Sequence, residues 1–284
     1  MDNSFEKRVV FFTGGTSGLG REAVLALALH GAKVAVTVRN KAKGEELLKT
    51  FLAKQANSKG EIKLFECDLS SIKSIQSAFN QFKIEYKRLD ILVNNAAVWK
   101  AKFTETVDRI EEAFQVNVLA PYLFSQLLAG LLEKSDHAKI INTTSYLHQG
   151  NIQFEDIEFR NSYKSFDVYR QSKLAVILLT RHFAQQFSNR GIGVYCFHPG
   201  LVRTELARET SFIMRSMFWL PGMSAEKGAQ TLIFLAMEDK EKLISGEYYC
   251  KKKISDSSSE SNDMELAEKL VQHIEKMDLP ILSE

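Results

Sequence analysis

The sequence has few cysteines and no histidine pair at a metal-binding spacing. Its three cysteines, Cys67, Cys196 and Cys250, are odd in number and widely separated. They match neither a disulfide framework nor a metal cluster, and they favour a reducing compartment. The six histidines form no H-x-x-x-H pattern, so we expect no metal site. These absences predict a cytoplasmic protein without a bound metal.

Long apolar runs and a charge excess are also missing. No uninterrupted apolar run approaches the roughly 18–20 residues that cross a bilayer, and the N-terminal MDNSFEKR lacks the apolar stretch of a signal peptide. We therefore predict no transmembrane segment, with peripheral membrane association left open. The 37 basic and 35 acidic residues give a net charge of +2, so we predict no nucleic-acid partner.

The chain does contain a regular alternation of short apolar runs and longer helical patterns. The strand candidates are RVVFFTG, KVAVTVR, IKLFECD, DILVNNA, KIINTTS, GVYCFHP and GEYYCKK. The helical candidates cover roughly 18–30, 41–55, 71–85, 106–132, 166–189, 224–237 and 264–276. Such alternation is typical of a parallel sheet covered by helices on both faces. We predict one α/β domain over 1–284, a doubly wound Rossmann sheet of about seven mostly parallel strands.

Two segments interrupt this alternation. Residues 205–223, ELARETSFIMRSMFWLPGM, are rich in phenylalanine and methionine and show only weak periodicity. Residues 251–263, KKKISDSSSESND, are polar and serine-rich, and we predict an exposed, mobile loop there.

A glycine-rich segment, TGGTSGLG, directly follows the first predicted strand and precedes a helical run. Gly14, Gly18 and Gly20 let the backbone turn tightly and bring the N-terminus of the helix close to an anion. This arrangement favours a dinucleotide cofactor. The alternative is that the glycines only permit a strand-to-helix turn.

The residues after the second and third strands bear on the cofactor. A carboxylate after the second strand is typical of NAD sites, but this chain has Arg39, a cation that can bind a 2′-phosphate. NADP(H) is therefore favoured over NAD(H), while Lys41 and Lys43 are interpreted as solvated charges. Asp68, after the third strand, either binds the adenine amino group or caps the helix that begins near Ser71.

Tyr169 and Lys173 lie four residues apart in the helical pattern DVYRQSKLAVILL and so share one helical face. They are either an acid/base pair or a solvated edge. Spacing alone does not decide, because EYYCKKK at 247–253 has the same spacing twice. Tyr248 and Tyr249 belong to a predicted strand, however, where residues four apart are not stacked one turn above the other.

Seven motifs in order resemble those of the short-chain dehydrogenase/reductase family: TGGTSGLG, CDLS, NNAA, FQVNVLAP, TTS, YRQSK and HPG. The resemblance covers nearly the whole chain. From Thr143 to Leu206 it is similar to the retinol dehydrogenase and WW-domain oxidoreductase branch. The chain departs from the usual pattern at Ala97, where glycine is common, which raises the question of whether the backbone there needs a positive φ.

This resemblance implies hydride transfer between nicotinamide and a carbonyl or alcohol carbon. Tyr169 is the implied general acid/base, and the charge of Lys173 is expected to lower its pKa. Ser145 is expected to bind the substrate oxygen. Asn117 is expected to anchor a water that links the lysine to solvent; without the resemblance, it would be interpreted as an exposed polar residue. The implied cofactor-binding residues are Gly14, Thr16, Ser17, Gly18, Leu19, Gly20, Arg39, Asn40, Asp68, Leu69, Asn95, Ala96, Ala97, Thr143, Tyr169, Lys173, Pro199, Gly200, Val202 and Thr204.

The substrate and assembly follow less directly. Residues 205–223 take the place of the family's substrate lid, and their apolar side chains predict a small apolar carbonyl or alcohol substrate. Packing on the core, or against a partner or membrane, is the alternative. Many relatives dimerise through the helices that contain Asn117 and Tyr169, so a homodimer is compatible with the resemblance.

Two other functions compete with this one. A serine hydrolase that uses Ser145 and His148 has no G-x-S-x-G motif to support it. A non-catalytic NADP(H) sensor or scaffold is disfavoured because all four implied catalytic side chains are present.

Overall fold

Eight strands form one sheet in the computed structural model, which describes residues 5–55, 58–200, 223–277 and 279. The strands are β1 (Val9–Phe12), β2 (Lys33–Val38), β3 (Glu61–Glu66), β4 (Ile91–Asn94), β5 (Lys139–Thr143), β6 (Gly193–His198), β7 (Tyr248–Cys250) and β8 (Lys253–Ile254). Their order is β3-β2-β1-β4-β5-β6-β7-β8, and all neighbours are parallel except β7 and β8. The order reverses between β1 and β4, where a doubly wound sheet binds its ligand.

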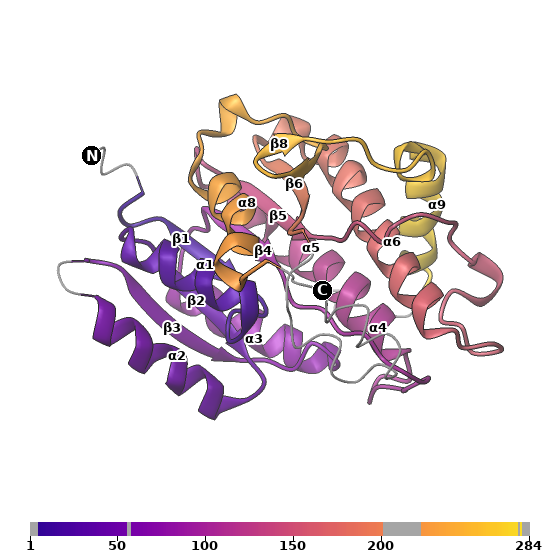
Figure 1. The fold of residues 1–284 in the computed structure, drawn as a ribbon, viewed down its shortest axis with the longest axis horizontal. Coiled ribbons are helices and arrows are strands. Elements are labelled where there is room, and N and C mark those ends of the chain that lie inside the picture. The colour runs from indigo at the N-terminus through magenta and orange to yellow at the C-terminus, as the bar shows by residue number, and fades with distance from the viewer. Residues whose placement is uncertain (1–4, 56–57, 201–222, 278, 280–284) are drawn as a thin grey trace.

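Helices cover both faces of this sheet (Figure 1). They are α1 (Gly18–Leu29), α2 (Lys41–Lys54), α3 (Ile72–Glu85), α4 (Glu112–Phe114), the π-helical η1 (Gln115–Leu119), α5 (Ala120–Leu132), α6 (Ser165–Gln186), α8 (Ala225–Met237) and α9 (Met264–Glu275). Short 3-10 turns are η2 (Phe154–Asp156), η3 (Ser188–Arg190), η5 (Lys240–Lys242) and η6 (Glu260–Asn262).

The two faces of the sheet bury two separate apolar cores. Phe11 belongs to the core that also contains side chains of α3, α5, α6 and α9, whereas the next residue, Phe12, belongs to the core that contains side chains of α1, α2 and α8. Successive side chains of a strand point to opposite faces, so a continuous apolar strand serves both cores. The predicted single α/β sheet with helices on both faces is confirmed.

The helix predicted over 106–132 is wrong at its N-terminal end, because it begins only at Glu112. Arg109 has a φ of +60°, which ends any helical run before it. The carboxylate of Glu111 then caps the helix by accepting a hydrogen bond of 2.7 Å from the Phe114 N–H. The sequence pattern predicts a helix that begins too early because Val107 and Ile110 continue the helical spacing of apolar residues.

The polar segment 251–263 is only in part the predicted exposed loop. Lys251 and Lys252 have φ values of +49° and +64° and form a two-residue turn that allows β8 to pair with β7. Ser261 is fully buried, and the guanidinium of Arg181 donates hydrogen bonds to Ser257 and Ser261. The prediction missed these contacts because a serine-rich composition carries no information about a distant arginine.

One segment, Glu112–Leu132, is long and apolar enough to cross a membrane by length and composition. This segment comprises α4, η1 and α5. The expectation that the chain has no candidate transmembrane segment therefore does not hold by length and composition. Its most apolar window is 83% buried inside the fold. That burial is typical of a core helix, which passes the same test of length and apolarity.

Candidate active site

Three glycines shape the loop between β1 and α1. Gly14 has a φ of +69°, and a Cβ atom there would lie 2.7 Å from the Cα atom of Ala96. A Cβ atom on Gly20 would lie 2.2 Å from the carbonyl oxygen of Gly14. Gly18 has a φ of +52°, but the space beside it is open. Two of the glycines thus let the loop pack closely, and the third leaves room for a ligand.

The N-terminus of α1 offers backbone N–H groups beside this open space. Its N-cap residue, Ser17, makes no side-chain hydrogen bond to the helix, and the first turn carries no acidic residue. Ser17 is exposed, Thr16 is half-buried and Leu19 is buried. Helix N-terminal N–H groups bind anions, and neither the N-cap side chain nor an acidic residue of the first turn competes for them here. The loop therefore fits the diphosphate of a dinucleotide cofactor.

Asn95 supports the glycine loop from the end of β4. Its Nδ2 donates hydrogen bonds to the carbonyl oxygens of Thr13, at 3.2 Å, and Gly14, at 2.9 Å. Its Oδ1 accepts a hydrogen bond of 3.2 Å from the Thr143 hydroxyl. The side chain therefore joins the ends of β1, β4 and β5. The backbone at Ala97 has no positive φ, so alanine brings no strain there.

The two residues after β2 differ in their environment. Arg39 is exposed. The side chain of Asn40 accepts a hydrogen bond of 3.2 Å from the Lys43 N–H and is the N-cap of α2. Asn40 thus has a structural role, as a helix cap, in addition to its predicted contact with the cofactor.

Asp68 does not cap α3, so that alternative is wrong. The N-cap is Ser71, whose hydroxyl accepts a hydrogen bond of 3.3 Å from the Ser74 N–H. Asp68 instead accepts hydrogen bonds from the Ser70 N–H, at 3.0 Å, and the Ser70 hydroxyl, at 2.7 Å. The next residue, Leu69, packs against the apolar core. Both predicted cofactor residues are half-buried in the loop after β3.

Tyr169 and Lys173 lie one turn apart in α6 and are both buried, with 6% and 2% of their surface exposed. The Lys173 ammonium lies 5.6 Å from the centre of the Tyr169 ring. It donates a hydrogen bond of 3.3 Å to the carbonyl oxygen of Thr143, the last residue of β5. The interpretation as a solvated edge is therefore wrong. The pair lies at the carboxyl end of a parallel strand, where such sheets bind ligands.

Burial shifts the pKa values of this pair in opposite directions. It raises the pKa of Tyr169 to about 12, although a hydrogen bond with the Ser145 hydroxyl acts against the shift. It lowers the pKa of Lys173 to about 8. The predicted lowering of the Tyr169 pKa by Lys173 is therefore not observed, because the cost of burying a charged phenolate dominates.

Ser145 follows β5 and is half-buried. Its hydroxyl lies close enough to the phenol of Tyr169 to lower the pKa of that phenol, and it accepts a hydrogen bond of 3.1 Å from the Leu147 N–H. The fold thus brings Ser145, Tyr169 and Lys173 together, as the sequence predicts for a shared site.

Asn117 lies in the π-helical turn η1 and is 1% exposed, so its interpretation as an exposed polar residue is wrong. Its Oδ1 accepts a hydrogen bond of 2.7 Å from the Val98 N–H. Its Nδ2 donates to the Val98 carbonyl, at 2.9 Å, and to the Ser172 hydroxyl, at 3.0 Å. Asn117 therefore connects the segment after β4 to the residue that precedes Lys173.

His148 lies near Ser145 but cannot accept the proton of its hydroxyl. The Nδ1 atom lies 2.8 Å from the carbonyl oxygen of Ser145, and Nε2 accepts a hydrogen bond of 3.0 Å from the Ser258 N–H. Nε2 must be unprotonated to accept this bond, so Nδ1 carries the proton and donates it. Burial also lowers the pKa of His148. The hydrolase alternative is therefore wrong.

The two tyrosines of EYYCKKK lie in β7 and do not form acid/base pairs. The Tyr248 hydroxyl donates to the carbonyl oxygen of Ser145 at 3.5 Å, and the Tyr249 hydroxyl accepts from the Ile244 N–H at 2.9 Å. Both rings are buried, whereas the lysines four positions later are exposed. The prediction that strand geometry separates these pairs is confirmed.

The HPG motif begins at the end of β6. Gly200 has a φ of +87°, and its N–H donates a hydrogen bond of 3.3 Å to Nδ1 of His198. Pro199 between them is half-buried, and burial lowers the pKa of His198 to about 4. The remaining predicted residues of this part lie outside the described residues: Val202, Thr204 and 205–222 of the predicted lid.

Trp99 is a site residue that sequence reasoning missed. Its indole ring stacks on the Tyr169 ring with a centroid distance of 4.1 Å and an angle of 5° between the planes. The one feature of the sequence that could have indicated Trp99 is its position two residues after the NNAA motif. Periodicity gives no reason to select it.

The model of the short chain dehydrogenase family matches residues 8–212. The chain belongs to this family. Retinol dehydrogenase 13 of Mus musculus is 34% identical over 273 residues, which cover 93% of this chain and 81% of that protein. Retinol dehydrogenase 11 of Homo sapiens is 33% identical over 267 residues, which cover 93% of this chain and 83% of that protein. The chain is thus a short chain dehydrogenase similar to retinol dehydrogenases, and an oxidoreductase.

Solved structures agree with this assignment. A mutant short-chain dehydrogenase/reductase of Serratia marcescens has a TM-score of 0.69 and 26% identity and covers 86% of this chain and 96% of its own. A protein of Mycobacterium paratuberculosis has a TM-score of 0.74 and 26% identity and covers 97% of this chain and 96% of its own.

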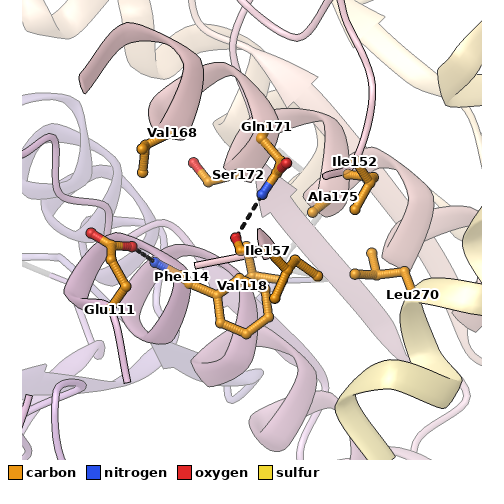
Figure 2. Close-up of a pocket in the computed structure, with 10 residues that line it drawn as sticks. All are labelled: Glu111, Phe114, Val118, Ile152, Ile157, Val168, Gln171, Ser172, Ala175 and Leu270. Carbon is orange, nitrogen blue, oxygen red and sulfur yellow. Dashed lines mark hydrogen bonds between the residues drawn. The ribbon is translucent and has the colours of Figure 1, made fainter. Parts of the chain in front are cut away.

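This short chain dehydrogenase also has a cavity on a second face of α6 (Figure 2). Its empty volume is about 260 Å³, part of it open to solvent. Its lining residues are Glu111, Phe114, Val118, Ile152, Ile157, Val168, Gln171, Ser172, Ala175 and Leu270. The α6 residues Val168, Gln171, Ser172 and Ala175 share one helical face, which differs from the face of Tyr169 and Lys173. The cavity is therefore not part of the site around Tyr169.

Proposed function

We propose that this chain is an NADP(H)-dependent oxidoreductase that transfers a hydride between nicotinamide and a carbonyl or alcohol of an apolar substrate. Tyr169 acts as general acid/base. The observation that carries the proposal is the buried pair Tyr169 and Lys173, with half-buried Ser145 beside it, at the carboxyl end of β5. Buried titratable groups with strongly shifted pKa values are typical of an active site, and here the chain also has a glycine loop that fits a cofactor diphosphate.

The cofactor supplies the hydride, and the protein supplies its position and a proton. The first turn of α1 and the glycine loop would hold the diphosphate, and Arg39 would bind a 2′-phosphate. Half-buried Asp68 and Leu69 would border the adenine. The residues at the ends of β4, β5 and β6 would hold the nicotinamide end: Asn95, Ala96, Ala97, Thr143, Pro199 and Gly200. Val202 and Thr204 are proposed for the same end from their sequence position alone.

In reduction, Tyr169 donates its phenolic proton to the substrate oxygen. With a pKa of about 12 the phenol is protonated at neutral pH, so it has a proton to donate. The Ser145 hydroxyl stabilises the charge that develops on the same oxygen. Lys173 compensates the phenolate that remains, because its ammonium lies close to the ring. Asn117 is proposed to anchor the water that returns a proton.

We expect higher initial rates of reduction with NADPH than with NADH. The assay is a panel of retinoid, steroid, fatty and aromatic aldehydes and ketones, because relatives are named retinol dehydrogenases. An Arg39→Glu variant replaces the exposed cation by a carboxylate, which repels a 2′-phosphate but can bind a ribose hydroxyl. It should lose about tenfold in kcat/KM for NADPH relative to NADH, or about 1.4 kcal/mol.

The exposed neighbour Lys41 provides the matched control. Lys41→Ala also removes one cation from this surface but should leave the cofactor preference unchanged. A wild-type preference for NADH contradicts the role of Arg39. Binding of NADPH without turnover of any panel compound supports the sensor or scaffold alternative instead.

We expect the rate of reduction to be level up to about pH 8 and to fall above it. Lys173, with its pKa lowered to about 8, loses its charge in this range, whereas Tyr169, with a pKa of about 12, keeps its proton. A pH profile of kcat measures the effect. In Lys173→Arg the cation persists to higher pH, so the fall should move upward. A fall at the same pH in both proteins contradicts the assignment to Lys173.

Two wider predictions stay open. The three cysteines Cys67, Cys196 and Cys250 are free, consistent with the predicted cytoplasmic location. For the homodimer, α9 lies beside α6 (Figure 1). Leu270 of α9 lines the cavity on the second face of α6 (Figure 2). In this chain α9 therefore occupies part of the surface of α6, one of the two helices through which relatives are expected to dimerise.

A further inference from the structure

Trp99 and Tyr169 form an almost parallel aromatic pair. The rings are separated by 4.1 Å between centroids and inclined by 5°. Trp99 is 3% exposed and Tyr169 is 6% exposed, so both rings are buried in the pair. Trp99 follows β4 and Tyr169 lies in the second turn of α6, so the pair joins two segments that are distant in sequence.

The indole is also fixed at its nitrogen. The Nε1–H lies 2.9 Å from the hydroxyl oxygen and 3.1 Å from the carbonyl oxygen of Ser165. Ser165 is the first residue of α6 and is four positions before Tyr169. The indole therefore contacts α6 twice, one turn apart: at its nitrogen on Ser165 and at its face on Tyr169. A planar side chain held at two points restricts the tilt of the phenol ring.

The segment that carries Trp99 is itself held by Asn117. The Asn117 side chain both accepts a hydrogen bond from the Val98 N–H and donates one to the Val98 carbonyl. The residue after the indole is held as well, because the Ser165 hydroxyl donates to the Lys100 carbonyl at 2.5 Å. The backbone is thus fixed on both sides of Trp99. The indole therefore has little freedom to move, and it limits the positions that the Tyr169 ring can take.

We propose that Trp99 is a positioning residue for Tyr169, whose indole sets the orientation of the phenol and excludes water from one face of its ring. This inference rests on the proposed role of Tyr169 as general acid/base. It deepens that role, because a proton donor must be held in a narrow range of positions to act efficiently. The exclusion of water also agrees with burial as the main cause of the raised pKa of Tyr169.

The test compares Trp99→Leu, Trp99→Phe and Phe166→Leu in the full chain. Trp99→Leu removes both the plane and the N–H donor, and should lower kcat on the order of 10- to 100-fold, the loss expected for a displaced catalytic group. Trp99→Phe keeps an aromatic ring but not the N–H donor, so its kcat should fall by a smaller factor. Phe166 contacts Trp99 at a centroid distance of 6.2 Å and lies in the same turn of α6 as Ser165, so its variant is the control and should keep wild-type kcat.

A second measurement follows Tyr169 itself in the protein without added cofactor. The tyrosinate absorbance of each protein, minus that of the same protein carrying Tyr169→Phe, reports the ionisation of Tyr169 alone. In the wild type, with a pKa of about 12, this difference should stay flat up to about pH 10, where ordinary tyrosines ionise. In Trp99→Leu it should rise within that range because water reaches the phenol.

The two measurements separate the two hypotheses. Wild-type kcat together with a flat absorbance difference in Trp99→Leu overturns the role of Trp99. A rise in absorbance without loss of kcat supports the effect of the indole on the phenol and overturns the acid/base role of Tyr169. If Trp99→Leu does not fold, Trp99→Phe is used instead. It should lower kcat by a smaller factor, and a kcat and an absorbance difference equal to those of the wild type would contradict the role of Trp99.

Discussion

Tyr169→Phe is expected to lower kcat by at least about 100-fold while the affinity for NADPH stays nearly intact. General acid/base groups contribute roughly 10²- to 10⁴-fold to a rate. The substitution removes only the hydroxyl and leaves the ring that stacks on Trp99, so the fold around it should be kept. Steady-state kinetics with a reducible aldehyde give kcat, and titration of NADPH fluorescence gives the affinity.

The control is Tyr249→Phe, because Tyr249 is also buried and also precedes a lysine by four residues. Its hydroxyl bonds to the Ile244 N–H in the chain segment before β7, so turnover should be unchanged. Equal activity of wild type and Tyr169→Phe would contradict the acid/base role. A similar loss in both variants would indicate a general effect of removing a buried hydroxyl.

The parts of the fold that sequence predicts well are those that depend on nearby residues. The continuous apolar runs of β1 and β2 indicate strands buried on both faces, and the structure confirms this. Tyr169 and Lys173 face the same side because four residues make about one helical turn. The glycine loop also follows from local chemistry, since a tight turn before a helix needs glycine at Gly14.

The parts that sequence predicts poorly depend on contacts between distant residues. A helical wheel assumes one constant period, so it cannot place Asn117, which lies in a π-helical turn. The stack of Trp99 on Tyr169 joins two segments that only the tertiary fold brings together. The sign of the Tyr169 pKa shift was missed for the same reason, because the extent of burial depends on the whole fold.

Gly20→Ala is expected to destabilise the protein, although helix propensity alone predicts the opposite. Gly20 lies within α1, where alanine is normally favoured over glycine by roughly 0.5–1 kcal/mol. A Cβ atom there would lie 2.2 Å from the Gly14 carbonyl oxygen and 2.6 Å from Nδ2 of Asn95. The carbonyl belongs to the backbone and cannot turn away, so α1 or the glycine loop must move, at a cost of about 1–3 kcal/mol or more.

The matched control is Gly130→Ala in α5. Gly130 is also a helix-interior glycine, but the space beside it is open, so alanine should raise the thermal midpoint slightly. Thermal unfolding without cofactor measures both variants. Since the same displacement moves the first N–H groups of α1, Gly20→Ala should also weaken NADPH binding at least about tenfold, or 1.4 kcal/mol. If Gly20→Ala instead resembles Gly130→Ala in both measurements, the close approach of α1 to the loop does not determine cofactor binding.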